Sequence, residues 1–141
     1  MNILVTGGLG YIGSHAVIEL IKCGHNAIIL DNCSNSYIKN LDAIRSIAQG
    51  DVIFYYGDIK DALLLDRIFN ENHIDAVMHF AGLKSVAQSE QNPIAYYNAN
   101  VAGSAVLFDV MSKNNVKKII FSSSATVYGL PDLLPIPETH N

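Results

Sequence analysis

The chain has 141 residues, half of them apolar, and a formal net charge of −4 at pH 7. This length suits one domain with a real core, and the charge argues against a surface for nucleic acids or anionic membranes, because no basic cluster exceeds Lys117-Lys118. No apolar run approaches a membrane span, and the first residues do not resemble a secretion signal. We expect a cytoplasmic protein, in which Cys23 and Cys33 stay unpaired.

Short apolar runs alternate with longer segments of helical period along the chain. Strands are expected at residues 2–6, 27–31, 52–56, 75–80 and 118–122. Helices are expected at residues 11–24, at 38–49 up to Gly50, after Asp61 as a cap with Leu64, Leu65, Ile68 and Phe69 on one face, and from Pro93 to about Asn114. Almost wholly apolar strands indicate a sheet covered on both faces, and the alternation indicates parallel pairing. The sequence therefore predicts an α/β fold with a doubly wound parallel sheet of the Rossmann type.

The last twelve residues differ in kind, because Pro131, Pro135 and Pro137 prevent a regular helix. We divide the chain into a dinucleotide-binding domain at residues 1–129 and an irregular tail at 130–141, with no substrate domain. The final predicted strand would leave an open apolar edge, which proteins normally pair or cover. We therefore expect either a portion of a longer protein, truncated before its last strands, or a covering partner chain.

A glycine-rich turn follows the first predicted strand. Gly7, Gly10 and Gly13 permit a tight turn and a close approach of the backbone to a pyrophosphate, while the next helix offers its free N–H groups. The alternative is a merely flexible turn. Asp31 argues against it, because it ends the second strand eighteen residues after Gly13. An acid there accepts hydrogen bonds from both ribose hydroxyls and repels a 2′-phosphate, which predicts NAD in preference to NADP.

Five segments together carry a family resemblance. They are Thr6-Gly7-Gly8-Leu9-Gly10-Tyr11-Ile12-Gly13-Ser14-His15, Asp31-Asn32, Gly57-Asp58-Ile59, His79-Phe80-Ala81-Gly82-Leu83-Lys84 and Phe121-Ser122-Ser123-Ser124-Ala125-Thr126-Val127-Tyr128-Gly129. They closely resemble the extended short-chain dehydrogenase/reductases, and among them the members that epimerise UDP-hexoses at C4. The resemblance runs through all 141 residues in register. Its segments follow successive strands, at the edge where open α/β sheets bind ligands.

The resemblance implies how NAD is bound. In the family the acid at Asp58 accepts from the adenine amino group and Ile59 packs on the ring, although Asp58 alone is equally well read as a helix cap. Residues 80–84 border the pyrophosphate and nicotinamide ribose, with Lys84 as their only cation, and Ser122 faces the cofactor. The complete set implied for the cofactor is Gly7, Gly10, Tyr11, Ile12, Gly13, Asp31, Asn32, Cys33, Ser34, Asn35, Ser36, Asp58, Ile59, Phe80, Ala81, Gly82, Leu83, Lys84 and Ser122.

The serine segment carries the implied catalytic residue. By resemblance, Ser124 contacts the sugar 4-OH and relays its proton, whereas by itself a serine run is only a polar exit from a strand. Sugar-nucleotide dehydratases of the superfamily carry Asp-Glu after the equivalent hydroxyl. Ala125 and Thr126 stand there in this chain, and neither moves a proton near neutral pH. The resemblance therefore implies interconversion of UDP-glucose and UDP-galactose through a 4-keto sugar.

The family takes its base from a Tyr-x-x-x-Lys pair on a helix after the serine segment, and this pair is absent. Tyr56 and Lys60 have the spacing, but they follow the third strand and Gly57 argues against a helix, so we interpret them as a chance match. The 141-residue chain alone is thus predicted to be inactive. The alternatives are a non-catalytic dinucleotide sensor or scaffold, and another NAD-dependent sugar-nucleotide enzyme.

One position departs from the family pattern. Ala99 replaces the first of two paired asparagines, so either Asn98 or Asn100 compensates or the cofactor affinity is reduced. The histidines lack metal-ligand spacing, so no metal is predicted, and His79 is expected to be a hydrogen-bonded core residue. The resemblance implies a UDP-hexose as the substrate of the full-length protein and leaves a homodimer open.

Overall fold

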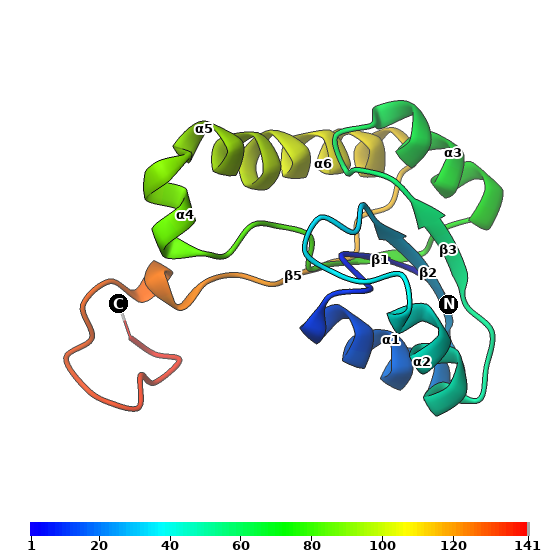
Figure 1. Cartoon of the computed structure of the whole chain (residues 1–141), viewed down its shortest axis with the longest axis horizontal. Helices are drawn as coiled ribbons and strands as arrows, with labels where there is room; N and C mark the ends of the chain where they lie inside the picture. Colours follow the sequence, from blue (N-terminus) through cyan, green and yellow to red (C-terminus); the bar gives the residue numbers. More distant parts are fainter. Residues whose placement is uncertain (141) are drawn as a thin grey trace.

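The computed structural model describes residues 1–140 and contains one five-stranded sheet, seen in Figure 1. The strands are β1 (Asn2–Thr6), β2 (Asn26–Asp31), β3 (Ile53–Tyr56), β4 (Ala76–His79) and β5 (Ile119–Phe121). Their spatial order is β3-β2-β1-β4-β5, and each neighbouring pair is parallel. The order reverses direction at β1, which confirms the predicted doubly wound sheet.

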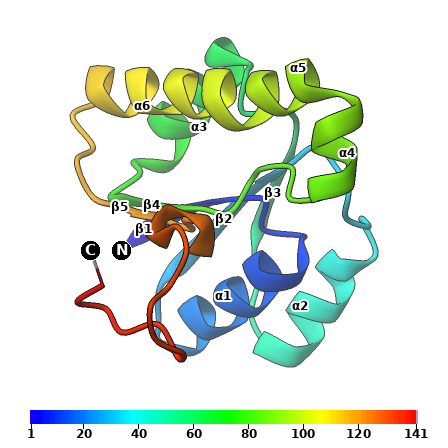
Figure 2. The same cartoon turned by 90° about the vertical axis from the view of Figure 1, so that its left-hand side faces the viewer.

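Helices cover both faces of the sheet, as Figures 1 and 2 show. The first pair, α1 (Tyr11–Lys22) and α2 (Asn40–Ala48), lies on one face. On the other face lie α3 (Ala62–Asn72) and α6 (Gly103–Lys113). The remaining helical segments are α4 (Val86–Gln91), α5 (Pro93–Tyr96), a π-helical turn (Tyr97–Ala102) and a 3₁₀ turn (Ala125–Tyr128).

Alternate residues of the central strands enter two separate cores. Leu4, Ile28 and Leu30 pack with the apolar sides of α3 and α6, in a cluster that also holds Leu65 and Leu107. The other cluster lies against α1 and α2, and its fully or nearly fully buried members include Ile3, Val5, Ala27, Ile29, Val17, Ile18, Leu41 and Ile44. Because both faces of each central strand are buried, the strands read as continuous apolar runs rather than as alternating ones.

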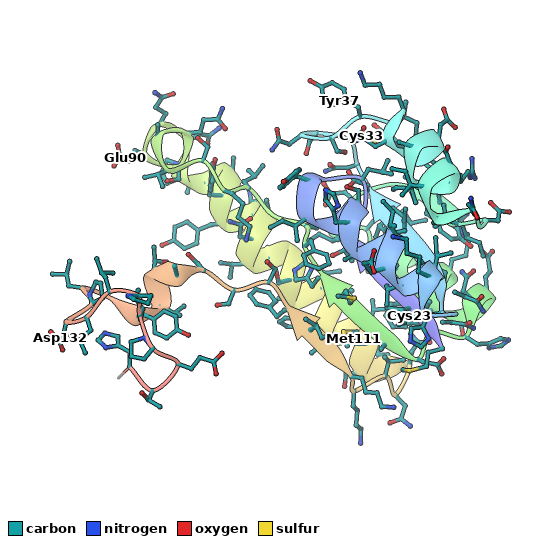
Figure 3. The ribbon with its side chains drawn as sticks, turned by 90° about the horizontal axis from the view of Figure 1, so that it is seen from below. Cys23, Cys33, Tyr37, Glu90, Met111 and Asp132 are labelled. Carbon is teal, nitrogen blue, oxygen red and sulfur yellow. The ribbon has the colours of Figure 1, made fainter. Side chains whose placement is uncertain are left out.

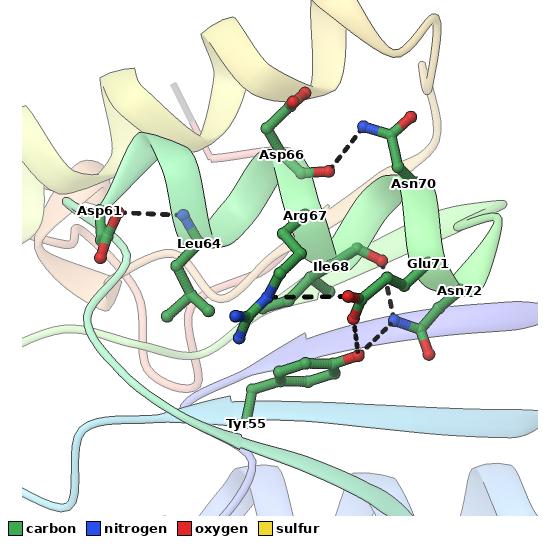
Figure 4. Close-up of polar contacts among 9 residues, drawn as sticks. All are labelled: Tyr55, Asp61, Leu64, Asp66, Arg67, Ile68, Asn70, Glu71 and Asn72. Atoms are coloured by element: carbon green, nitrogen blue, oxygen red, sulfur yellow. Dashed lines mark hydrogen bonds and ion pairs between the residues drawn. The ribbon is translucent and has the colours of Figure 1, made fainter.

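Polar contacts fix α3 at its two ends (Figure 4). The Asp61 carboxylate accepts a hydrogen bond of 3.0 Å from the Leu64 N–H, which confirms the predicted cap. Near the other end, the Tyr55 hydroxyl lies 2.8 Å from Glu71 Oε2 and accepts from Asn72 Nδ2 at 3.0 Å. These bonds join α3 to the edge strand β3.

Three helical predictions need correction. The helix expected from Pro93 to about Asn114 is divided by the π-helical turn into α5 and α6. The helix expected at 38–49 runs only from Asn40 to Ala48, and Gln49 ends it in the left-handed conformation, at φ 52°, one residue before Gly50. The short helix α4 was not predicted, since its exposed residues 86–91 have no apolar stripe.

The outer edge of the sheet is apolar and open in the described part of the chain. Ile119, Ile120 and Phe121 are 37%, 60% and 50% exposed, in agreement with the expected open edge. The regular strand has only three residues, fewer than the predicted 118–122. Residues 130–140 contain no helix or strand and extend away from the sheet, as the position of Asp132 in Figure 3 shows, while residue 141 lies outside the described residues.

Candidate functional site

The carboxyl ends of four strands, β1 to β4, meet at a cleft beside the point where the strand order reverses. Its lining residues come from the last residues of β2 and from the loops that follow the four strands, with one contribution from the π-helical turn. They are Gly7, Gly10, Leu30, Asp31, Asn32, Ser34, Asn35, Ser36, Gly57, Asp58, Ile59, Phe80, Ala81, Gly82, Leu83 and Ala99. In open α/β sheets this is the position at which ligands bind.

The glycine turn brings backbone, and no side chain, to the cleft. Gly7 has φ +69°, and a Cβ there would lie 2.7 Å from the Ala81 nitrogen. A Cβ on Gly10 would meet only the Gly7 carbonyl oxygen, at 3.2 Å, whereas one on Gly13 would collide with it. Gly10 is also the N-cap of α1 and supplies no side-chain cap, so the first N–H groups of the helix keep their hydrogen-bonding capacity. This arrangement suits an anion.

Asp31 is a structural centre of the site as well as a candidate ligand contact. Its side chain is buried, and Oδ2 accepts a hydrogen bond of 2.9 Å from the Leu9 N–H. Oδ1 accepts from the Cys33 N–H and the Ser36 hydroxyl, each at 2.9 Å. The carboxylate therefore ties the glycine turn to the loop after β2, which carries Cys33 in Figure 3. Since a carboxylate has about four acceptor positions, about one remains for a ligand.

Asp58 holds the loop after β3 against the loop after β2. One carboxylate oxygen accepts from the Lys60 N–H and the other from Asn32 Nδ2, both at 2.9 Å. The Lys60 ammonium lies 3.6 Å from the same carboxylate. The alternative of a helix cap does not hold, because Asp61 caps α3, and Ile59 between them is buried. Both acids thus present oxygens at one end of the cleft.

The opposite side of the cleft is formed by residues 80–83, which we call the cleft wall. Asn100 holds this wall: its Oδ1 accepts from the Leu83 N–H at 2.8 Å and its Nδ2 donates to the Leu83 carbonyl at 2.9 Å. Both ends of the amide are therefore engaged, and Ala99 is the residue that faces the cleft. Asn98 is exposed, and neither it nor Asn100 lines the cleft.

His79 lies buried directly behind the cleft wall. Its Nδ1 is 2.6 Å from the Thr6 hydroxyl and its Nε2 is 3.0 Å from the Ser104 hydroxyl. The prediction of a hydrogen-bonded core residue is confirmed. Burial, and to a smaller extent the positive charge of Lys84, lowers the pKa of His79 from 6.5 to about 4. The imidazole is consequently neutral at pH 7.

The serine segment takes part in the local backbone structure. The Ser122 N–H donates to the His79 carbonyl at 3.1 Å, continuing the pairing of β4 with β5. Ser124 is exposed and caps the 3₁₀ turn, with its Oγ 3.3 Å from the Thr126 N–H. Tyr56 is the last residue of β3, and no described helix contains both it and Lys60, as their interpretation as a chance match requires.

Most of the residues predicted for the cofactor meet at the cleft. Those that do not line it, among the described residues, are Tyr11, Ile12, Gly13, Cys33, Lys84 and Ser122. The predicted cofactor set omitted Leu30 and Gly57, which lie where β2 and β3 end, and Ala99 of the π-helical turn. Within residues 1–140 no group of three potential metal ligands comes together, and no helix is both long and apolar enough to cross a membrane.

The fold and cleft define the chain as a Rossmann-type domain with a cleft at its topological switch point, where such domains bind ligands. The family model described as GDP-mannose 4,6 dehydratase matches residues 4–141, and the chain belongs to this family. It is similar to UDP-glucose 4-epimerases: 53% identical over 97% of the chain to one from Neisseria meningitidis serogroup A, and 50% identical over 98% to one from Bacillus subtilis.

Solved structures of UDP-glucose 4-epimerases share this fold. One from Bifidobacterium longum in complex with NAD⁺ and UDP is 50% identical, with a TM-score of 0.96 over 100% of this chain and 42% of its own. One from Stenotrophomonas maltophila with bound NAD and formylated UDP-arabinopyranose has the same TM-score and coverage at 44% identity. The chain spans about 40% of the length of the curated relatives it matches.

The buried neutral His79 predicts a loss of stability in acid. Between pH 6.5 and about 4 the unfolded chain binds a proton at this residue and the folded one does not. The contribution of His79 to the free energy of unfolding is therefore fully present above pH 6.5. It is lost as the pH falls towards 4, and the total loss is roughly 3 kcal/mol. Urea unfolding of the wild type and His79→Gln at pH 7 and pH 4.5 measures it. The variant should lose less stability between the two pH values, whereas the exposed His15→Gln should behave as the wild type does.

Proposed function

We propose that this chain is the NAD-binding domain of a UDP-hexose 4-epimerase. One observation carries the assignment: the uncapped N-terminus of α1, above a glycine turn, opens on the same cleft as the carboxylates of Asp31 and Asp58. A dinucleotide has a pyrophosphate for the helix end and ribose hydroxyls and an adenine amino group for the acids. The relatives crystallised with NAD support the proposal.

The residues at the cleft fit such a cofactor. We place the pyrophosphate at the backbone of Gly7, Gly10 and α1, because both glycines line the cleft and a Cβ at Gly10 would meet only the Gly7 carbonyl oxygen. The adenosine lies towards Asp31, Asn32 and Asp58 with Ile59, next to the Cys33–Ser36 loop, and the nicotinamide towards residues 80–84 and Ser122. When bound, NAD supplies the hydride acceptor. Lys84, which has no ion-pair partner within residues 1–140, places a positive charge at that end.

We infer 4-epimerisation of UDP-glucose and UDP-galactose from the serine segment and the relatives. Ser124 is exposed beyond the end of β5, where its hydroxyl is available to a sugar 4-OH. Ala125 and Thr126 follow it and carry no carboxyl group to expel water. Their presence favours epimerisation over dehydration, although the family model is described as a dehydratase.

The unpaired Cys23 and Cys33 support a cytoplasmic location.

The first test concerns the pyrophosphate position at Gly10. Gly10→Val should abolish measurable NAD binding, because the branched side chain would occupy the space beside the helix end, while Gly10→Ala should weaken it less. Calorimetry with NAD, paired with circular dichroism, separates binding from folding. If folded Gly10→Val binds NAD as the wild type does, the pyrophosphate is not bound there.

The second test concerns the choice of cofactor by Asp31. The unmodified chain should bind NAD more tightly than NADP, and Asp31→Ala should weaken NAD binding and reduce the preference, by about tenfold for one charge-assisted hydrogen bond. Because Asp31 also accepts from Leu9 and Cys33, the variant must be compared at a temperature well below its unfolding midpoint. Equal affinities of the unmodified chain for the two cofactors would contradict the assignment.

The third test concerns turnover. The 141-residue chain with added NAD should show no sustained interconversion of UDP-glucose and UDP-galactose, since a general base contributes about 10²- to 10⁴-fold and substrate positioning contributes more. A longer form with a Tyr-x-x-x-Lys helix should turn over, and Ser124→Ala should lower its kcat while NAD binding persists. Turnover by the 141-residue chain, freed of host epimerase, would require a base among its own residues.

A further inference from the structure

A continuous series of hydrogen bonds runs behind the cleft, from the cleft wall at Ala81 to Asn100, whose side chain holds that wall. The Ala81 N–H lies 3.4 Å from Thr6 Oγ1, and Thr6 Oγ1 lies 2.6 Å from His79 Nδ1. On the other side of the imidazole, Nε2 lies 3.0 Å from Ser104 Oγ. Ser104 Oγ in turn lies 2.6 Å from the carbonyl oxygen of Asn100.

The chemistry of the groups fixes the direction of every bond in this series. A carbonyl only accepts, so the single hydroxyl hydrogen of Ser104 is donated to Asn100. Ser104 Oγ must therefore accept from His79, and Nε2 carries the hydrogen. The buried imidazole is neutral, so Nδ1 has none and accepts from the Thr6 hydroxyl. The oxygen of Thr6 is then left to accept from the Ala81 N–H.

Both ends of the series act on the same short segment. One end reaches the backbone of Ala81 directly, while the other reaches the π-helical turn at Asn100. The side chain of Asn100 makes its paired bonds to the Leu83 backbone. The segment between these two attachments includes Gly82, where a Cβ would lie 3.0 Å from Asn100 Oδ1, so the wall and the amide are in close contact.

We propose that His79 is a positioning residue for the cofactor: as the Nε2–H tautomer it holds the cleft wall through Thr6 on one side and through Ser104 and Asn100 on the other. The inference rests on the proposed function, because the wall is the part of the cleft assigned to the nicotinamide half of NAD. The imidazole joins three elements that are far apart in the sequence, β1, β4 and α6. In this tautomer the Thr6 hydroxyl donates to Nδ1, and Nε2 donates to the Ser104 hydroxyl.

The tautomer is measured first, on the protein without cofactor. Long-range ¹H–¹⁵N spectra of the imidazole at pH 7 should give His79 as a single neutral species, protonated at Nε2 and unprotonated at Nδ1. His73→Gln and His79→Gln spectra assign the resonances. A hydrogen on Nδ1, a mixture of the two tautomers or a charged ring would overturn the series, whatever the protein binds.

The functional part is measured by NAD calorimetry on two matched pairs of variants. Ser104→Ala breaks the link to Asn100, whereas Ser112→Ala removes an exposed hydroxyl on the same helix. Thr6→Val removes the donor to Nδ1, whereas Thr6→Ser retains it. Ser104→Ala and Thr6→Val should raise the Kd for NAD by about three- to tenfold, as for a lost buried hydrogen bond, while the two controls should stay near the wild type.

Amide hydrogen exchange at Leu83 separates positioning from a general loss of stability. The Leu83 N–H, protected by Asn100 in the wild type, should exchange faster in Ser104→Ala while amides in the central strand β1 keep their protection. If the wild type binds NAD and Ser104→Ala binds it equally well, the positioning role is wrong and the proposed function stands. A wild type that binds no NAD overturns the proposed function and, with it, the role of His79 towards the cofactor.

Discussion

The pairing of β1 with β2 on one side and with β4 on the other is the constraint on which the site depends. Both pairs are parallel, so the carboxyl ends of the three strands finish at the same edge. The loops that follow leave the sheet in different directions. Those after β1 and β2 lead to α1 and α2 on one face, whereas the loop after β4 leads to the helices on the other face. The cleft lies where these loops separate.

Polar side chains at this edge of the sheet make hydrogen bonds within the protein and so fix the loops around the cleft. The Asp31 carboxylate accepts from Leu9, Cys33 and Ser36 and so positions two of the loops. Buried polar groups need such partners, since an unsatisfied one is costly in free energy. A ligand at the cleft would consequently meet a surface that is already organised by bonds within the protein. Substitution of Asp31 therefore affects both the loops and the ligand site.

The two positions directly after Ser124 carry no carboxyl group. The residues that follow, Ala125 and Thr126, form a 3₁₀ turn, in which Thr126 contacts Ser124 through its backbone and its hydroxyl. A hydroxyl is a poor acid and base near neutral pH. The turn therefore supplies hydrogen-bonding hydroxyls but no general acid or base of its own. The fold alone is compatible with many reactions, so the proposed epimerisation rests on the side chains at this turn and on the relatives.

The sequence by itself determined where strands and helices alternate along the chain, the glycine turn after the first strand, and the position of Asp31 at the end of the second. These features depend on local periodicity and on residues at fixed spacing. The tertiary structure alone decided which polar groups pair. Thr6 and His79 are 73 residues apart, and their contact arises only when β1 and β4 lie side by side. The π-helical turn that directs Asn100 to the cleft wall and leaves Ala99 facing the cleft has no signal in the local pattern either. Local propensity acts over a few residues, whereas these partners are set by where whole strands end against one another.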